Sequence, residues 1–201
     1  MSALTLFIKY LLDPSSAKGI VGEGIVKKTL IEQKNFYSFH DITISGQQID
    51  HVLICTKGIF TIETKNYSGT IYGSYLKRDW SQVFQCMGKY NTYYKKNTFY
   101  NPVMQAENHS KALHFYLKKA FGISQYVKTL VVFTGSAHLK VFSPKTPVVY
   151  HKNLMNQISS MPSIMSVSEC QSLARTLQIV ANDIVNRNKT TFHYPIIVQS
   201  T

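Results

Sequence analysis

The stretch Gln48–Lys65, QIDHVLICTKGIFTIETK, decides how this chain folds. It holds two runs rich in β-branched and aromatic residues, 48–56 and 59–65, a composition typical of strands. The dipeptide Lys57-Gly58 between the two runs is a tight-turn signal. The stretch therefore predicts a hairpin of two antiparallel strands.

Three charged side chains of this hairpin, Asp50, Glu63 and Lys65, are predicted to share one face. Side chains alternate between the two faces of a strand, so His51 points away from Asp50 and is interpreted as a packed, hydrogen-bonded histidine. A two-residue loop puts Asp50 opposite Lys65, and a four-residue loop puts Asp50 opposite Glu63. Either register brings the three groups within roughly 5–8 Å of one another, whereas a slip of one residue would separate them.

Charged groups on strands with apolar neighbours are costly unless they are paired or bind a cation. Two carboxylates with few other protein ligands suit Mg²⁺, which keeps several waters and takes oxygen ligands from phosphates. A lysine beside them can position water or stabilise charge on a phosphate. The pattern leaves two interpretations open: a metal-dependent catalytic site, or a network of ion pairs on an exposed sheet face.

The flanking sequence predicts further helices and strands around this hairpin. Three glycines within 19–24 weaken the first predicted helix and indicate a close approach of another part of the chain. We interpret 80–100 as short strand mixed with loop, because it has little clean periodicity. The order of elements predicts an α/β fold with a mixed central sheet flanked by helices. The other predicted elements are helices over 14–31, over 103–121 and after a capping box at Ser166 and Glu169, and strands over 36–45, 69–75, 127–135 and 148–150.

Basic residues outnumber acidic ones by 22 to 10, which gives a net charge of +12. The excess is greatest in residues 77–128, which hold nine bases and two acids. Such a balance favours a polyanionic partner, either nucleic acid or an anionic membrane. The hydrophobic content of 44% excludes a wholly disordered chain. We expect contacts to DNA from Lys77, Arg78, Lys89, Lys95, Lys96 and Lys111.

Aromatic residues are interleaved with lysines between residues 89 and 100. Aromatic rings interleaved with basic groups are typical of surfaces on which nucleic-acid bases stack. The alternative is a loop packed on the sheet. Trp80 is interpreted as a core or edge anchor of the sheet rather than a base-stacking platform.

Residues 1–13 form an apolar segment that is too short to span a bilayer as a helix. We interpret it as a short helix packed on the core, with attachment to an anionic membrane surface as the alternative. Residues 14–201 are predicted to form a single domain. Three widely spaced cysteines indicate neither a disulfide framework nor a zinc site, and they favour a reducing compartment such as the cytoplasm.

Several motifs follow one another in a defined order: Gly22-Glu23, Gln48–Ile54, Lys57–Phe60, Ile62–Gly69, Trp80, Asn101–Gln105 and His109. The ordered set resembles the nuclease-related domain (NERD), which is placed in the PD-(D/E)XK restriction-endonuclease-like superfamily. The resemblance covers roughly residues 19–135, and its most specific part is the unbroken string IETKNYSG at 62–69. It implies a core of order α-β-β-β-α-β, in agreement with the elements predicted above.

The resemblance also implies roles for the residues of the hairpin. Asp50 and Glu63 would bind the metal, with the main-chain carbonyl of Thr64 as a further ligand. Lys65 would be the catalytic lysine. Ile49 precedes Asp50 where the name of the superfamily has proline, which is a common departure.

Two residues outside the hairpin match other positions of the family. Glu23 matches an acidic position that often completes such sites, and it would serve a second metal ion if two are bound. Gln105 matches a glutamine that orients water or a phosphate. One metal ion and two are both compatible with this set.

The implied reaction is hydrolysis of phosphodiester bonds in DNA. Lys65 would help to position the attacking water, and Mg²⁺, which Mn²⁺ can replace, would stabilise charge on the leaving oxygen. No small-molecule cofactor is expected. The alternatives are a non-catalytic nucleic-acid-binding module of the same fold and a membrane-associated protein with a basic surface.

Overall fold

The computed structural model describes residues 13–188. The elements, in chain order, are α2 Pro14–Ile31, β1 Tyr37–Ile44, β2 Gln47–Cys55, β3 Gly58–Lys65, β4 Thr70–Ser74, β5 Asp79–Met87, β6 Thr92–Tyr100, α3 Pro102–Phe121, β7 Val127–Phe133, β8 His138–Phe142, β9 Val148–Tyr150, the 3₁₀-helix η1 His151–Asn153, α4 Leu154–Ser159 and α5 Val167–Asn188. No helix within the described residues is long and apolar enough to cross a membrane. Residues 1–12, for which a short helix packed on the core or, alternatively, attachment to a membrane surface was predicted, lie outside the described part.

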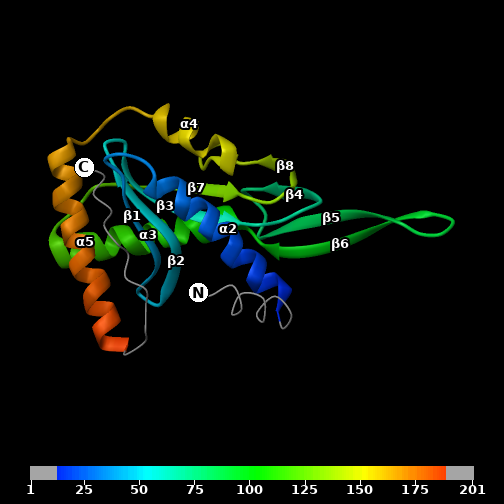
Figure 1. Cartoon of the computed structure of the whole chain (residues 1–201), viewed down its shortest axis with the longest axis horizontal. Helices are drawn as coiled ribbons and strands as arrows, with labels where there is room; N and C mark the ends of the chain where they lie inside the picture. Colours follow the sequence, from blue (N-terminus) through cyan, green and yellow to red (C-terminus); the bar gives the residue numbers. More distant parts are fainter. Residues whose placement is uncertain (1–12, 189–201) are drawn as a thin grey trace.

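The main sheet has five strands in the order β1-β2-β3-β7-β9. β1, β2 and β3 pair antiparallel, while β7 and β9 add in parallel beyond β3. This confirms the mixed central sheet flanked by helices. The predicted α-β-β-β-α-β order is present as α2, β1, β2, β3, α3 and β7, with β4–β6 inserted before α3 (Figure 1).

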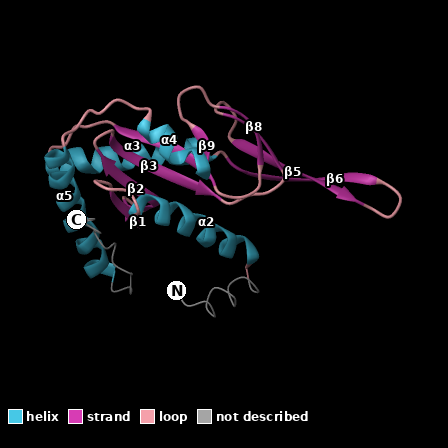
Figure 2. Cartoon of the chain, turned by 45° about the horizontal axis from the view of Figure 1, so that its top comes forward, coloured by secondary structure: helices cyan, strands magenta, loops and turns pink. Residues whose placement is uncertain are grey.

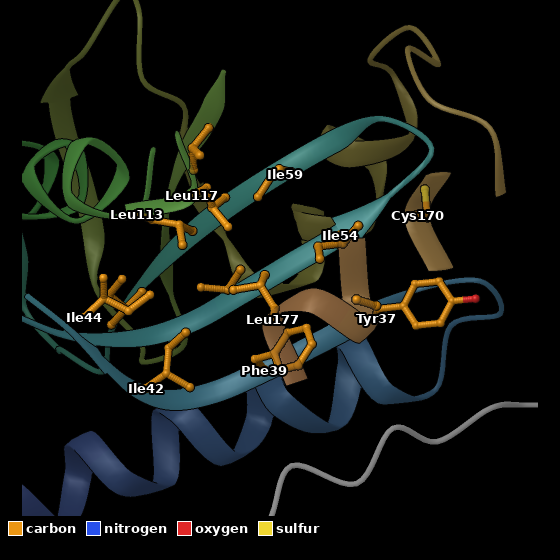
Figure 3. Close-up of a cluster of buried hydrophobic side chains, with 14 of the residues drawn as sticks. Tyr37, Phe39, Ile42, Ile44, Ile54, Ile59, Leu113, Leu117, Cys170 and Leu177 are labelled. Atoms are coloured by element: carbon orange, nitrogen blue, oxygen red, sulfur yellow. The ribbon is translucent and has the colours of Figure 1, made fainter. Parts of the chain in front are cut away.

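Helices cover both faces of the main sheet. α3 and α5 pack on one face, where Ile54 and Leu177 belong to a single apolar cluster (Figure 3). α2 and α4 pack on the other face, in a cluster that includes Leu30 and Phe60. Alternate residues of β2 and β3 supply the two clusters, so these strands are buried on both sides along most of their length. This explains their nearly continuous apolar sequence.

β4, β5, β6 and β8 form a second sheet in the order β6-β5-β4-β8. A third apolar cluster, with Ile71, Trp80 and Phe133, joins this sheet to the end of β7 and the start of α3. β5 and β6 continue past the cluster as a two-stranded hairpin that projects from the body in both views (Figure 1, Figure 2). We call this hairpin, residues 79–100, the arm. Trp80 is fully buried at its base, which confirms the core-anchor interpretation.

Three details of the β-structure differ from the sequence-based expectations. The hairpin loop is Thr56-Lys57, because Gly58 adopts a φ of 122° and already pairs with Cys55. The observed register is therefore the one expected from the longer loop. The segment 69–75 begins the second sheet instead of extending the first, and 80–100 forms two continuous strands rather than a mixture of strand and loop.

The first helix, α2, approaches the sheet closely at one of its glycines. A Cβ on Gly22 would lie 2.7 Å from Thr134 Oγ1 and 2.8 Å from Asn66 Cβ. Gly24, by contrast, has open space around it. The predicted close approach is thus confirmed at Gly22, and it brings the neighbouring Glu23 towards the end of β3.

Candidate functional site

The register of β2 and β3 brings the two predicted carboxylates together. His51 pairs with Ile62, so the next pair in the same register is Asp50 and Glu63. The backbone N–H of Thr64 donates to Asp50 Oδ2 at 2.8 Å, which fixes the Asp50 carboxylate against β3. Asp50 is half-buried, and Glu63 is only 1% exposed.

Lys65 connects this carboxylate pair to α3. Its Nζ donates to Glu63 Oε1 at 2.7 Å and to Gln105 Oε1 at 3.2 Å. Glu63 and Lys65 are two residues apart on one strand, so their side chains leave the same face. Gln105 comes from the first turns of α3, which packs on that face. The structure therefore brings together Asp50, Glu63, Lys65 and Gln105, as the sequence predicted.

His109 is a neighbour of this site to which the sequence analysis gave no role. Its Nδ1 lies 3.3 Å from Glu63 Oε2, a buried oxygen that makes no hydrogen bond. His109 follows Gln105 by four residues on α3, which puts the two on the same side of the helix. That spacing is the sequence signal that identifies His109 as part of the site.

The electrostatics of Asp50 reflect its crowded surroundings. Burial, and next the negative charge of Glu63, raise the pKa of Asp50 from 3.8 to about 8, although the N–H of Thr64 opposes the shift. Smaller contributions to this pKa come from the charge of Glu23, which raises it, and from that of Lys65, which lowers it. Two carboxylates this close are costly to ionise together unless a cation lies between them.

Lys65 stays positively charged in this environment. Burial alone would lower the pKa of its ammonium group, but the charge of Glu63 and the hydrogen bond to it outweigh burial and raise the pKa above its ordinary value. Lys65 is therefore a hydrogen-bond donor and a positive charge, not a base.

The opposite face of the sheet carries a histidine pair, the buried His51 on β2 and the half-buried His40 on β1. His51 Nε2 is 3.1 Å from Thr64 Oγ1, and its Nδ1 is 2.8 Å from His40 Nδ1. Burial lowers the pKa of both rings, that of His40 to about 3 with a smaller contribution from Lys27. Both rings are therefore neutral, and His51 is the packed, hydrogen-bonded histidine that was predicted. It supports the Thr64 segment from behind.

Glu23 approaches the site from α2, on the other face of the sheet from α3. Its charge reaches Asp50, as the pKa of that group records. Within residues 13–188, no three His, Cys, Asp or Glu side chains are grouped closely enough to hold a metal ion by themselves. Whether Glu23 or the carbonyl of Thr64 completes a metal site stays a prediction.

The pair Asp50 and Glu63 nevertheless fits a hard cation such as Mg²⁺ or Mn²⁺. Both residues offer carboxylate oxygens, which these ions prefer, and Mg²⁺ needs only one or two of them. Glu63 Oε2 is buried without a hydrogen bond, and the pKa of Asp50 is raised by burial and next by repulsion from Glu63, both of which a bound cation would offset.

The predicted DNA-binding residues lie in three places. Lys77 and Arg78 are exposed at the base of the arm, and Lys89, Lys95 and Lys96 are exposed along it. Lys111 lies elsewhere, at a cavity of about 470 Å³ formed by α3, the start of β7 and residues 145–147. None of the four site residues lines that cavity.

Comparison with known proteins identifies the family of the chain. Residues 18–134 match the family model described as nuclease-related domain. The chain belongs to the nuclease-related domain family. The match begins within α2 and ends just after β7, so it contains most of α2, the rest of the α-β-β-β-α-β core and the arm.

Two individual proteins are similar to this member of the family. An uncharacterized protein of Bacillus anthracis is 30% identical over 191 residues, which cover 88% of this chain and 84% of the relative. A structure of SfsA from Pyrococcus furiosus in complex with Ca²⁺ matches with 16% identity and a TM-score of 0.26. That match covers 78% of this chain and spans about half the length of SfsA, 52%.

Proposed function

We propose that this protein is a metal-dependent nuclease that hydrolyses phosphodiester bonds in DNA. The observation that carries the proposal is the buried Glu63 carboxylate, which has one oxygen on Lys65 and the other without a hydrogen bond, next to Asp50. A catalytic function accounts for this costly arrangement on a buried strand, and membership of a nuclease-related family supports the same reaction.

Four residues of the site have a part in this proposal. Asp50 and Glu63 would hold Mg²⁺ or Mn²⁺. When bound, the metal supplies positive charge for the oxygens of the phosphodiester in the transition state. The Lys65 ammonium donates a hydrogen bond to the attacking water or to a phosphate oxygen. Gln105 is a positioning residue, because its Oε1 accepts from Lys65 Nζ and restrains that side chain.

A cleavage assay on supercoiled and linear DNA with Mg²⁺, Mn²⁺ or EDTA tests the proposal. We expect Lys65→Ala and Asp50→Ala each to lower metal-dependent cleavage by at least about a hundredfold, because both remove groups that stabilise transition-state charge. Affinity for DNA should stay within about threefold, since most contacts to phosphates lie elsewhere. Lys118→Ala, an exposed lysine at the far end of α3, is the control. Cleavage that survives in both variants would overturn the assignment.

A non-catalytic nucleic-acid-binding module is the second candidate. The observation that favours it is the ion pair between Lys65 and Glu63, which already satisfies one carboxylate oxygen. In that case the protein binds DNA, but the purified wild-type chain gives no cleavage with any metal ion in the same assay.

A further inference from the structure

Most of the arm is exposed and does not pack on the rest of the described structure. The last pair that joins it to a neighbouring strand within the described residues is Thr70 on β4 with Val83 on β5. Beyond Val83 the two strands pair only with each other, and every residue of β6 except Phe99 is exposed. Isolated two-stranded hairpins are at best marginally stable in water. A hairpin that projects this far is therefore expected to bind a partner.

The chemistry of the arm indicates a polyanion. Between Trp80 and Ala106 the chain has three lysines and no acidic residue. Pairing puts Tyr93 and Lys95 on one face of the arm, and Tyr94 and Lys96 on the other. Both faces thus present a ring and a positive charge, and Tyr90 at the tip is 88% exposed. A protein partner would cover one apolar face, whereas this ribbon is basic on both.

The base of the arm is fixed beside the candidate catalytic site. Tyr67, two residues after Lys65, packs its ring edge against Phe99 with centroids 4.7 Å apart. Gln82 Nε2 donates to the carbonyl of Ser68 at 2.8 Å. At the other strand, β6 leads through Asn101 directly into the first turn of α3, which carries Gln105. A molecule bound along the arm is therefore held at a defined distance from Lys65.

We propose that the arm lies along duplex DNA, in the major groove, and grips it to one side of the phosphate that is cleaved. This inference rests on the proposed nuclease function. The seven steps from Trp80 to Met87 span about 24 Å of strand, and phosphates of one DNA strand are spaced about 3.4 Å apart along the axis. The tip thus reaches about seven base pairs from the site. A groove about 12 Å wide admits a two-stranded ribbon and meets both of its faces.

Binding of fluorescent duplexes in EDTA, followed by anisotropy, tests the arm without any need for cleavage. One variant joins Val83 to Lys96 through an Asn-Gly turn, which removes the projecting part and keeps the paired base. A second, Lys95→Ala/Lys96→Ala, keeps the whole hairpin. We expect both variants to bind a 24-base-pair duplex at least about tenfold more weakly than wild type. On duplexes shorter than about seven base pairs, the two variants and wild type should bind with the same affinity.

The matched control is Lys118→Ala/Lys119→Ala, which removes two adjacent exposed lysines at the end of α3 that is remote from Gln105. Its affinity should stay within about twofold of wild type, because net charge alone acts weakly over distances beyond the screening length. Equal losses in the two double variants would overturn the proposal. So would equal, equally arm-dependent binding of single-stranded DNA of the same length.

Two other partners give distinguishable outcomes. If the edge of β6 pairs with a second copy of the chain, deletion of the arm converts a dimer to a monomer in size-exclusion chromatography and leaves DNA affinity unchanged. If the arm binds membranes, vesicles with anionic lipid capture wild type but not the deletion variant, again with unchanged DNA affinity. Either result overturns the proposal.

The tests of the arm and of the nuclease function can fail separately. Arm-dependent duplex binding without cleavage by wild type overturns the nuclease function and leaves a DNA-gripping hairpin. Metal-dependent cleavage with arm-independent binding leaves the nuclease and overturns the role of the arm.

Discussion

The ammonium group of Lys65 pairs with Glu63. The negative charge of Asp50 is therefore the less well compensated of the two carboxylates. The ammonium group contacts Glu63 Oε1 directly, whereas its charge affects Asp50 only weakly. Asp50 is stabilised chiefly by the Thr64 N–H, against burial and the charge of Glu63. A cation that binds between the two carboxylates is therefore attracted most strongly by Asp50.

Asp50→Asn tests this imbalance through the pH dependence of stability. The folded-state pKa of Asp50 is about 8 against an ordinary 3.8, so the folded protein retains a proton that the unfolded chain releases. Its contribution is therefore favourable at low pH, and stability falls as pH rises between about 4 and 8. Asparagine keeps the acceptor for Thr64 N–H and removes the charge. In EDTA at pH 8.5 we expect a gain of about 2 kcal/mol and a rise in Tm of roughly 4–8 °C.

The same substitution should have a much smaller effect on Tm near pH 5, which lies only about one unit above the pKa of Asp50 in the unfolded chain. Glu32→Gln, which changes an exposed carboxylate on α2, is the control and should leave Tm nearly unchanged at both pH values. A lower Tm for Asp50→Asn at pH 8.5, measured by scanning calorimetry, would contradict the burial argument.

At the scale of elements, the sequence predicts those parts of the fold that have a buried face. β2, β3, β7 and α3 were found because apolar residues recur along them with strand or helix spacing. The arm was missed because both of its faces are polar and aromatic, so no alternation between buried and exposed residues marks it as strand. The turn before β3 was displaced by one residue because glycine fits either a turn or the start of a strand.

Asn101 joins β6, the second strand of the arm, to α3, the helix that carries Gln105. Its Oδ1 accepts from the N–H groups of Val103 and Met104, and its Nδ2 donates to the carbonyls of Ser74 and Lys77. Asn101→Ala removes the helix cap and leaves the buried Val103 N–H without its partner, so we expect a loss of about 2–3 kcal/mol in urea unfolding. Asn97→Ala, an exposed amide on β6, should change stability by less than about 0.5 kcal/mol. Equal effects would show that Asn101 has no special structural role.

Cys86 offers a direct probe of the arm. It is half-buried on β5 and faces Tyr93, whereas Cys55 and Cys170 are buried, which raises the pKa of both thiols. A maleimide should therefore modify Cys86 first, as mass spectrometry of the digested protein would show. If DNA lies along the arm, a saturating 24-base-pair duplex should slow this modification by at least about fivefold, because it covers the thiol. An unchanged rate, with binding verified by anisotropy, would contradict contact at this point.

For the whole molecule, the sequence predicts where charged residues are concentrated more accurately than it predicts how their side chains are arranged in space. The excess of bases over acids in residues 77–128 is visible in the sequence, and the structure distributes it over the arm, its base and α3. Sequence also grouped Asp50, Glu63 and Lys65, because strand alternation fixes their face in either register. It gave no measure of how α3 orients its side chains, so it left His109 without a role. Lys111 is exposed at a cavity away from the arm, and its contact with DNA stays a prediction.

The dependence of DNA affinity on salt is the whole-molecule consequence of this charge distribution. Each lysine that contacts a phosphate releases counterions, and log K falls against log salt with a slope of about −0.9 per contact. Affinity for a 24-base-pair duplex, measured between low and high salt by anisotropy, should therefore fall steeply for wild type. Lys95→Ala/Lys96→Ala should reduce the slope by about 1.8, because two contacts are lost. Lys118→Ala/Lys119→Ala carries the same net charge and should keep the wild-type slope, since those lysines lie far from the arm. Parallel slopes for all three proteins would mean that net charge, not the arm, attracts the DNA.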